Sequence, residues 1–177
     1  MAPFSVPWEK MNRTFERLLF APISLSAAVL GKVISSFLYG LVISLVPLAI
    51  GLIFFSSHIA DYPALILGIL LGNLCMACMG MLVSTVKATA PPKVMMVLNV
   101  VRLPMMFMSG VFLAISTLPT WGRVLAWFSP LSYPTDLLYR GLGFPHYFNM
   151  AFSIFMIVLF TAIFFLFSVR RMRPSDL

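Results

Sequence analysis

Charged residues are scarce in this chain of 177 residues, and acidic residues are the scarcest among them. Aspartate and glutamate together number five, against twelve lysines and arginines, and charged residues make up 10% of the sequence. A soluble domain normally carries about 25% charged residues. Apolar residues make up 61%, more than a chain of this length can bury, because much of a small domain's surface stays wet. The composition excludes an ordinary soluble domain and indicates an integral membrane protein, whose solvent is lipid.

The residue patterns needed for catalysis are also missing. None of the five acidic residues falls within a long apolar run, so no carboxylate pair is placed there for acid–base chemistry. The sequence contains no Walker A loop and no other glycine motif that cradles phosphate. We therefore expect a chain that is not an enzyme and holds no cofactor of its own. The basic residues mainly flank apolar runs, which argues against nucleic acid as a partner.

The two cysteines, Cys75 and Cys78, lie in one apolar run. They are too close on a helix to form an unstrained disulfide. Their CxxC spacing lacks the βαβ setting of a redox motif, and His58 and His146 fall in separate predicted loops, so we expect no metal site. Packing is the favoured role of these thiols. A small membrane redox or metal protein that uses Cys75 and Cys78 is the alternative.

Four apolar runs are long enough to cross a bilayer as helices. Between the third and the fourth, residues 116–147 are too polar and too rich in proline to cross, and they fit two short helices, Thr120–Phe128 and Pro134–Arg140. Asp136 and Arg140 are spaced for an ion pair across one helical turn. The predicted fold class is an all-α, polytopic transmembrane helix bundle. Its four spans cover residues 33–55, 64–86, 94–115 and 148–169.

Basic residues near the span ends are distributed unevenly. With four crossings, nine lysines and arginines fall on one side and only Arg123 and Arg140 on the other. The positive-inside rule then places the first side, and both chain termini, in the cytoplasm. We expect the membrane that holds the protein to be the plasma membrane. The nine are Lys10, Arg13, Arg17, Lys32, Lys87, Lys93, Arg170, Arg171 and Arg173.

Three features within the predicted spans are unusual. Arg102 is the one charge inside a span, and such residues are costly and often functional; structural anchoring and lining of a polar pathway are both open. Gly68 and Gly72 have the small-xxx-small spacing that lets helix backbones approach closely. Asn73, in the same run, is expected to face protein or water.

The segment before the first span is amphipathic. From Trp8 to Phe20, apolar residues can share one helical face while charged residues populate the rest. Such a helix lies on a membrane surface or against a partner protein. An ordinary solvated helix is the other interpretation.

Three blocks of sequence, in residues 9–32, 103–119 and 129–140, keep a fixed order relative to the spans. The residues concerned are Thr14, Glu16-Arg17-Leu18-Leu19, Ala21-Pro22-Ile23-Ser24 and Gly31-Lys32 in the first block, Leu103-Pro104, Phe107-Met108-Ser109-Gly110-Val111-Phe112 and Leu118-Pro119 in the second, and Ser129-Pro130-Leu131-Ser132-Tyr133-Pro134, Asp136-Leu137-Leu138 and Arg140 in the third. Together these blocks resemble the ABC-2 type permeases, the membrane subunits of ABC exporters. The resemblance covers nearly the whole chain.

The resemblance implies one ABC-2 type transmembrane domain over residues 1–177 that forms the pathway for efflux of a drug, lipid or glycoconjugate. ATP would be bound by a separate ABC ATPase subunit, which docks on a coupling helix in residues 8–24. Residues 116–147 would form an outer re-entrant hairpin, and a second permease copy would complete a dimer within the membrane lipids. The candidate site residues are Thr14, Glu16, Arg17 and Leu18 for ATPase docking, and Arg102, Ser109, Gly110, Asp136 and Arg140 for the pathway or its structural support.

Two departures from the family pattern have consequences. Arg13 stands where the family usually has a glycine before the threonine, which would stiffen or reposition the docking segment. The family usually has six spans, and this chain begins where the second would have ended. It therefore resembles a truncated or split permease, with a separate piece supplying the first two helices. A non-transporting remnant or assembly factor is a further alternative.

Overall fold

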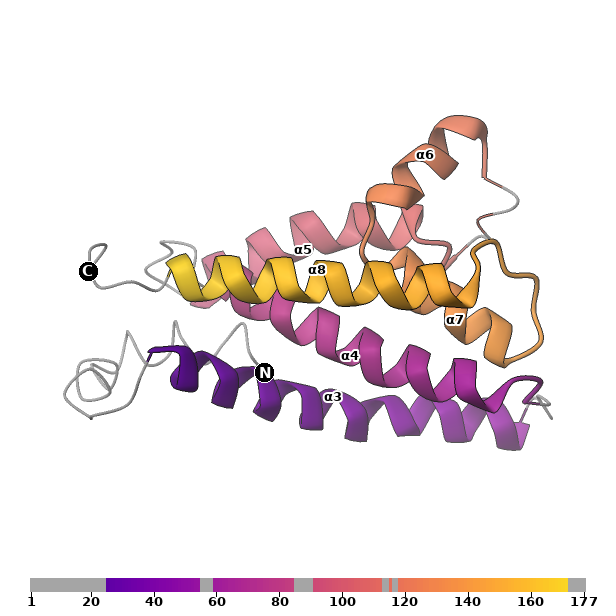
Figure 1. The fold of residues 1–177 in the computed structure, drawn as a ribbon, viewed down its shortest axis with the longest axis horizontal. Helices are drawn as coiled ribbons and strands as arrows, with labels where there is room; N and C mark the ends of the chain where they lie inside the picture. The colour runs from indigo at the N-terminus through magenta and orange to yellow at the C-terminus, as the bar shows by residue number, and fades with distance from the viewer. Residues whose placement is uncertain (1–24, 55–58, 85–90, 113–114, 116–117, 172–177) are drawn as a thin grey trace.

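The computed structural model describes residues 25–54, 59–84, 91–112, 115 and 118–171. Within those residues every regular element is a helix (Figure 1), which confirms the predicted all-α class. The predicted coupling helix in residues 8–24 lies outside the described part of the chain. The described helices are α3 (Leu25–Phe54), α4 (Tyr62–Ser84), α5 (Pro91–Met108), α6 (Thr120–Phe128), α7 (Ser132–Gly141) and α8 (Met150–Arg171).

The four long helices run up and down beside one another, and the short helices α6 and α7 lie at one end (Figure 1). We call this the hairpin end; α3 and α5 finish there, and α4 and α8 begin there. The opposite end, where α3 begins and α8 finishes, is called the basic end. Helix α4 is the centre of the bundle because α3, α5, α7 and α8 all pack on it.

Three of the described helices are long and apolar enough to cross a membrane. They are α4, α8 and the Val29–Gly51 part of α3, while α5 contributes a shorter apolar stretch, Met96–Met108. The outward faces of these helices carry large apolar side chains, such as Ile53 and Phe155, that no other part of the described chain covers. Helices satisfy their own backbone hydrogen bonds, so such faces suit hydrocarbon. The chain is a membrane protein with several helical spans.

Most predicted span limits lie close to the helix limits, and two differ strongly. Helix α3 begins at Leu25, well before Val33, because a lysine at a membrane edge does not interrupt a helix. Helix α5 ends at Met108, before the predicted limit at residue 115. Gly110 there has a φ of 84°, the left-handed conformation that commonly ends a helix and that glycine adopts without strain.

Helices α7 and α4 approach each other closely because each presents glycine to the other. A Cβ built on Gly68 would lie 3.1 Å from Leu137 Cβ, and one on Gly72 would lie 2.8 Å from Pro134 Cβ. The predicted small-xxx-small pair therefore does allow a close approach, and its partner is the short helix α7. Gly141 plays the same part from the α7 side, since its Cβ would lie 2.7 to 2.9 Å from Leu65 Cβ, Cα and N.

Substituting Gly141 by alanine is expected to destabilise the protein by about 1–3 kcal/mol, the usual cost of overpacking, because backbone atoms of Leu65 must move. Thermal unfolding in detergent, followed with a thiol-reactive dye that reports exposure of Cys75 and Cys78, measures the effect. Gly51→Ala is the matched control, because nothing lies within 4 Å of its added Cβ and alanine favours a helix. Equal unfolding temperatures for the two variants would contradict the close α4–α7 packing.

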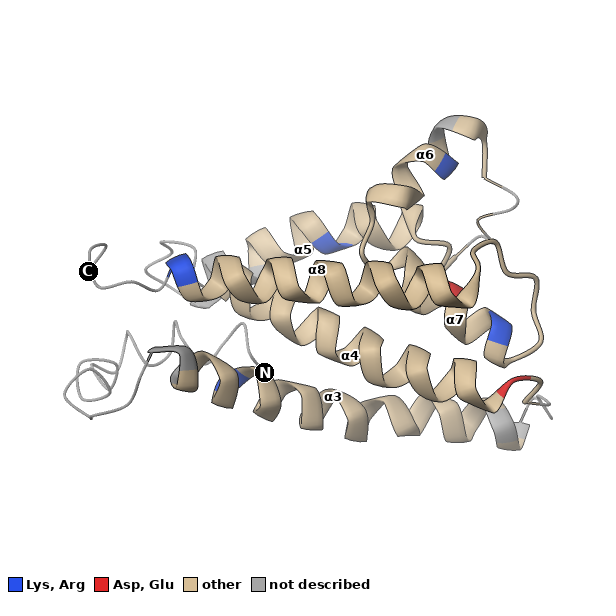
Figure 2. Cartoon of the chain, viewed as in Figure 1, with Lys and Arg blue, Asp and Glu red and all other residues tan. Residues whose placement is uncertain are grey.

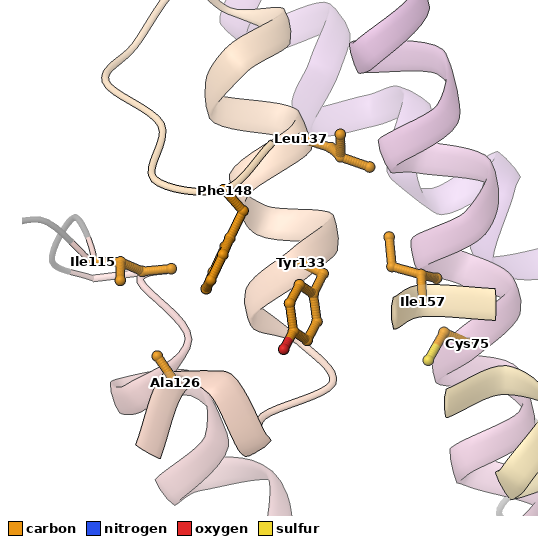
Figure 3. Packing of buried hydrophobic residues seen from close by; sticks show 7 residues of the cluster. All are labelled: Cys75, Ile115, Ala126, Tyr133, Leu137, Phe148 and Ile157. Atoms are coloured by element: carbon orange, nitrogen blue, oxygen red, sulfur yellow. The ribbon is translucent and has the colours of Figure 1, made fainter. Parts of the chain in front are cut away.

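Buried apolar side chains form two clusters, one towards each end of the bundle. Val29, Val33, Cys78 and Met81 join α3 to α4 towards the basic end, with Val169 of α8 against them. The second cluster, towards the hairpin end, joins α4, α6, α7 and α8 around Tyr133, which Figure 3 shows between Phe148 and Ile157. The hairpin is therefore built into the helix bundle. The members of the second cluster are Cys75, Ile115, Ala126, Tyr133, Leu137, Phe148 and Ile157.

Candidate functional site

A cleft of about 400 Å³ lies among α3, α4 and α5. Helices α3 and α5 both pack on α4, so α4 forms the floor and the other two helices form the walls. The lining mixes polar and apolar groups, with one cation, Arg102, contributed by α5. The residues around the cleft are Ser36, Tyr39, Gly40, Ile43, Ser44, Pro47, Asn73, Met76, Ala77, Met79, Gly80, Leu98 and Arg102.

The cleft lies at mid-depth of the bundle. Asn73 is the central residue of α4, eleven positions from Tyr62 and eleven from Ser84, which is roughly 16 Å from either helix end at 1.5 Å per residue. The hydrocarbon core of a bilayer is about 30 Å thick. The polar groups of the cleft therefore fall close to the middle of the hydrocarbon layer, where lipid offers them no hydrogen bonds.

Arg102 has no acidic partner among the described residues. Its side chain is exposed beside the cleft, and the two acidic residues within the described ranges, Asp61 and Asp136, belong to the hairpin end (Figure 2). Leu98 lies one turn before Arg102 and lines the same cleft, so both side chains share one face of α5. Of the two interpretations of Arg102, the geometry favours the lining of a polar pathway.

Gly40 sets the width of the cleft at its floor. The Asn73 amide nitrogen donates to the carbonyl oxygen of Ile69 at 2.9 Å, and a Cβ built on Gly40 would lie 2.6 Å from Asn73 Oδ1. A side chain at position 40 would therefore require the Asn73 amide to move. Ser36, Gly40 and Ser44 recur at intervals of four, which places them on one face of α3. That interval is the sequence signal that indicates this wall, in addition to the signals of Arg102 and Asn73.

A second cavity, of about 180 Å³, continues the cleft towards the hairpin end. The two cavities share Ser44, Asn73 and Met76. The second is bounded by Pro134 and Thr135 of α7, which lie above the glycine face of α4. The two cavities therefore form a continuous track from mid-depth to the underside of the hairpin, with polar groups at Ser44 and Asn73 and a mainly apolar lining beyond them.

Ser109 and Gly110 lie in the turn that ends α5. The Ser109 hydroxyl donates to the Met106 carbonyl at 3.1 Å, and the Tyr139 hydroxyl of α7 donates to the Gly110 carbonyl at 3.0 Å. These two candidate residues line neither cavity. Their geometry favours structural support, because they tie the end of α5 to the hairpin.

The predicted ion pair between Asp136 and Arg140 within α7 is wrong. The Arg140 Nε instead donates to Asp61 Oδ2 at 3.0 Å, and Asp61 also accepts from the backbone N–H of Ala64 at the start of α4. The Asp136 carboxylate accepts the backbone N–H of Tyr147 at 2.7 Å and that of Phe148 at 3.0 Å. Both residues thus fasten the hairpin to the spanning helices, since buried charge is stable only when it is hydrogen-bonded.

The contribution of Asp136 to the free energy of unfolding is expected to decrease as pH rises. Burial raises the pKa of this carboxyl above its ordinary 3.8, although the N–H groups of Tyr147 and Phe148 and the nearby His146 and Arg140 lower it. An acid with a higher pKa in the folded chain binds more protons when folded. The stability that it contributes is complete below its unfolded pKa and disappears as pH rises through the folded pKa.

Thermal unfolding of the wild type and of Asp136→Asn, from about pH 4 to about pH 8, isolates this effect. The wild-type unfolding temperature minus that of the variant should fall as pH rises, because the amide does not titrate. A difference that grows with pH would show that the ionised carboxylate, held by its two N–H donors, is the better-stabilised form.

The two thiols occupy different parts of the core. Cys75 lies in the cluster around Tyr133, and Cys78 lies in the cluster that joins α3 to α4. Both are free and buried, and no group of three or more metal-ligating side chains occurs among the described residues. Their surroundings agree with packing, the favoured role, and give the redox alternative no support.

The residues assigned to ATPase docking, Thr14, Glu16, Arg17 and Leu18, lie outside the described residues. A comparison of the sequence with protein families includes these residues in its matched range. The ABC-2 type transporter family model matches residues 1–142, a range that contains the predicted docking segment, the cleft helices α3, α4 and α5, and both hairpin helices. Comparison with curated proteins and with solved structures gave no significant match. With most of its length matched, the chain belongs to the ABC-2 type transporter family, as the membrane component of such a system.

Proposed function

We propose that this chain is the permease subunit of an exporter and that a separate ABC ATPase drives it. The observation that carries the proposal is the cleft with Arg102 at mid-depth of an ABC-2 membrane domain. A charge at that depth is expensive, and in membrane proteins it usually marks a substrate or ion pathway. Transporters commonly bind their substrates near the bilayer midplane.

The charge distribution of the helices supports an orientation with both termini in the cytoplasm. Figure 2 shows basic residues on α3 and α8 at the basic end. Lys32, Lys93, Arg170 and Arg171 belong to this end, and no acidic residue does within the described ranges. At the hairpin end two arginines are balanced by two aspartates. An excess of lysine and arginine marks the cytoplasmic side of a plasma-membrane protein, so the track runs from mid-depth outwards to the hairpin.

Residues 8–24 are the proposed docking site for the ATPase. The sequence from Trp8 to Phe20 has an amphipathic pattern, and residues 8–24 fall within the family match. They directly precede α3 in the sequence, and α3 begins at the proposed cytoplasmic end. ATP-driven movement of the ATPases would then rock two permease copies between inward-facing and outward-facing states. The protein itself supplies the pathway and the docking surface.

Copurification from membranes tests the docking site. The tagged wild-type chain should capture an ABC ATPase, and Glu16→Lys should capture at least about tenfold less, equivalent to about 1.4 kcal/mol of binding free energy. Asp176→Lys makes the same charge change outside residues 8–24 and outside the family match, and should capture the wild-type amount. A chain that inserts normally and captures no ATPase would favour the remnant or assembly factor instead.

A further inference from the structure

The chemistry of the cleft narrows the class of molecule that it can bind. Arg102 brings one positive charge to a site whose other polar groups are the uncharged side chains of Ser36, Tyr39, Ser44 and Asn73. No acidic residue of the described chain lines the cleft. An anion stabilises an arginine at this depth of the membrane, and the planar guanidinium can hold a phosphate or carboxylate through two hydrogen bonds. A complementary ligand therefore carries a single anionic group.

The shape of the cleft adds a second requirement. A volume of about 400 Å³ lies within the usual range of small-molecule sites, about 300–1,000 Å³, and holds a headgroup without long acyl chains. Tyr39 and Ile43 line the cleft and are nevertheless 45% and 50% exposed. The cleft therefore opens sideways onto the apolar outer surface of α3, which hydrocarbon covers.

We propose that the cleft binds the anionic headgroup of an amphiphile, with Arg102 as its counter-ion and with its apolar chains leaving through the lateral opening beside Tyr39 and Ile43. The inference rests on the proposed function, because it names the class of molecule that the exporter moves. The Asn73 amide donates one of its two hydrogens to Ile69 and can donate the other to the same headgroup. Ser44 and Asn73 also border the second cavity, through which the headgroup would advance towards the hairpin.

Selective lipid retention by the purified full chain tests the site without any ATPase. The chain in neutral detergent is equilibrated with equal amounts of dioleoyl phosphatidylglycerol and dioleoyl phosphatidylcholine, and the retained lipids are quantified by mass spectrometry. We expect retention of the anionic lipid to exceed that of the zwitterionic lipid by about tenfold, the ratio that about 1.4 kcal/mol of selectivity gives. Equal retention by the wild type would overturn the proposal.

Two variants assign the selectivity to the cleft. Arg102→Gln should reduce the ratio to near one, whereas Arg171→Gln removes the same charge at the basic end and should leave the ratio close to that of the wild type. An equal fall in both variants would show general attraction to a positive protein and would overturn the site. Glycerol phosphate at the same concentration should displace none of the lipid; displacement would identify a site for free anions instead.

A fluorescent reporter keeps the test decisive if Arg102→Gln does not fold. In a Tyr39→Trp variant with Arg102 intact, phosphatidylglycerol with brominated chains should quench the added fluorescence more strongly than brominated phosphatidylcholine. Equal quenching would count against the proposal. Selective binding by a chain that captures no ATPase would instead overturn the exporter role while leaving the anion site in place.

Discussion

Replacing Arg102 by leucine is expected to make the protein more stable and the transporter inactive. Placing an arginine at the middle of a membrane helix costs about 2.5–3.5 kcal/mol on insertion scales. Because the Arg102 side chain is exposed beside the cleft, leucine recovers only part of that cost as stability. Activity should fall, because the variant loses the one cation that the described residues contribute to the cleft. Stabilising substitutions at functional sites commonly reduce activity in this way.

Two measurements on the same preparation test the Arg102 prediction. Thermal unfolding reports stability, and ATP hydrolysis by the complex with its ATPase, stimulated by an anionic amphiphile, should fall by a factor of about ten to a hundred, or about 1.4–2.8 kcal/mol. Arg171→Leu is the control, since it removes an arginine from the exposed end of α8 and should change neither quantity strongly. Unchanged stimulation with normal assembly would exclude Arg102 from the pathway.

Truncating Tyr133 to alanine is expected to cost about 3–5 kcal/mol, the largest loss of stability from a single side chain in this bundle. Tyr133 is 0% exposed and its ring packs against those of Phe148, Phe152 and Phe160 of α8 and the connection before it. Its hydroxyl donates to the Trp127 carbonyl of α6 at 2.7 Å. One side chain thus joins α6, α7 and α8, and its loss leaves a cavity among all three.

Two matched variants separate the contributions of Tyr133. Tyr133→Phe keeps the ring and removes the hydrogen bond, so it should cost only about 0.5–1.5 kcal/mol, the net contribution of one hydrogen bond. Phe155→Ala removes an aromatic ring that is 62% exposed on α8 and should change stability by no more than about 0.5 kcal/mol. If all three variants unfold together in a thermal scan, the hairpin is not held by this cluster.

The helices were predictable because their signals are local. Prolines surround the hairpin helices: Pro119 precedes α6, Pro130 follows it and Pro134 lies in the first turn of α7, where its missing N–H costs nothing. The predicted Thr120–Phe128 helix agrees with α6. Long apolar runs between polar loops predicted the remaining helices for the same reason.

Interactions between distant residues were not predictable in the same way. Arg140 lies one turn from Asp136, and the local rule for helix pairs therefore joined them. Its actual partner, Asp61, is 79 positions away in the sequence. Asp136 is satisfied by the N–H groups that precede α8, and those groups reach it only after α7 and α8 have packed together. The sequence order holds no sign of that geometry.

The residues that α4 and α5 contribute to the cleft were partly predictable from the sequence, and those that α3 contributes were not. A lone arginine in an apolar run indicates function by its cost, and Asn73 was expected to face protein or water. The wall formed by α3 could have been predicted only if the spacing of four residues among Ser36, Gly40 and Ser44 had been interpreted as a helix face that contacts Asn73. Serine and glycine are frequent in membrane helices, so such an interval becomes informative only when the neighbouring helix is known.

The central claim, a polar pathway at mid-depth between α3, α4 and α5, is tested most directly by single-cysteine accessibility in intact membranes. Ser44 lies ten residues before the end of α3, and Leu159 lies nine residues after the start of α8, so cysteines at these two positions have nearly equal depth from the hairpin end. Ser44→Cys faces the cleft and Leu159→Cys faces lipid. The wild-type chain, whose two native thiols are buried, measures the background modification.

A water-filled cleft lets a hydrophilic, membrane-impermeant thiol reagent reach Ser44→Cys, whereas hydrocarbon excludes the reagent from Leu159→Cys. We expect modification of Ser44→Cys at least about tenfold faster than that of Leu159→Cys, with an anionic amphiphile slowing the first reaction only. Equal, slow modification at both positions would mean that lipid or protein fills the space between the helices, and that no pathway runs through it.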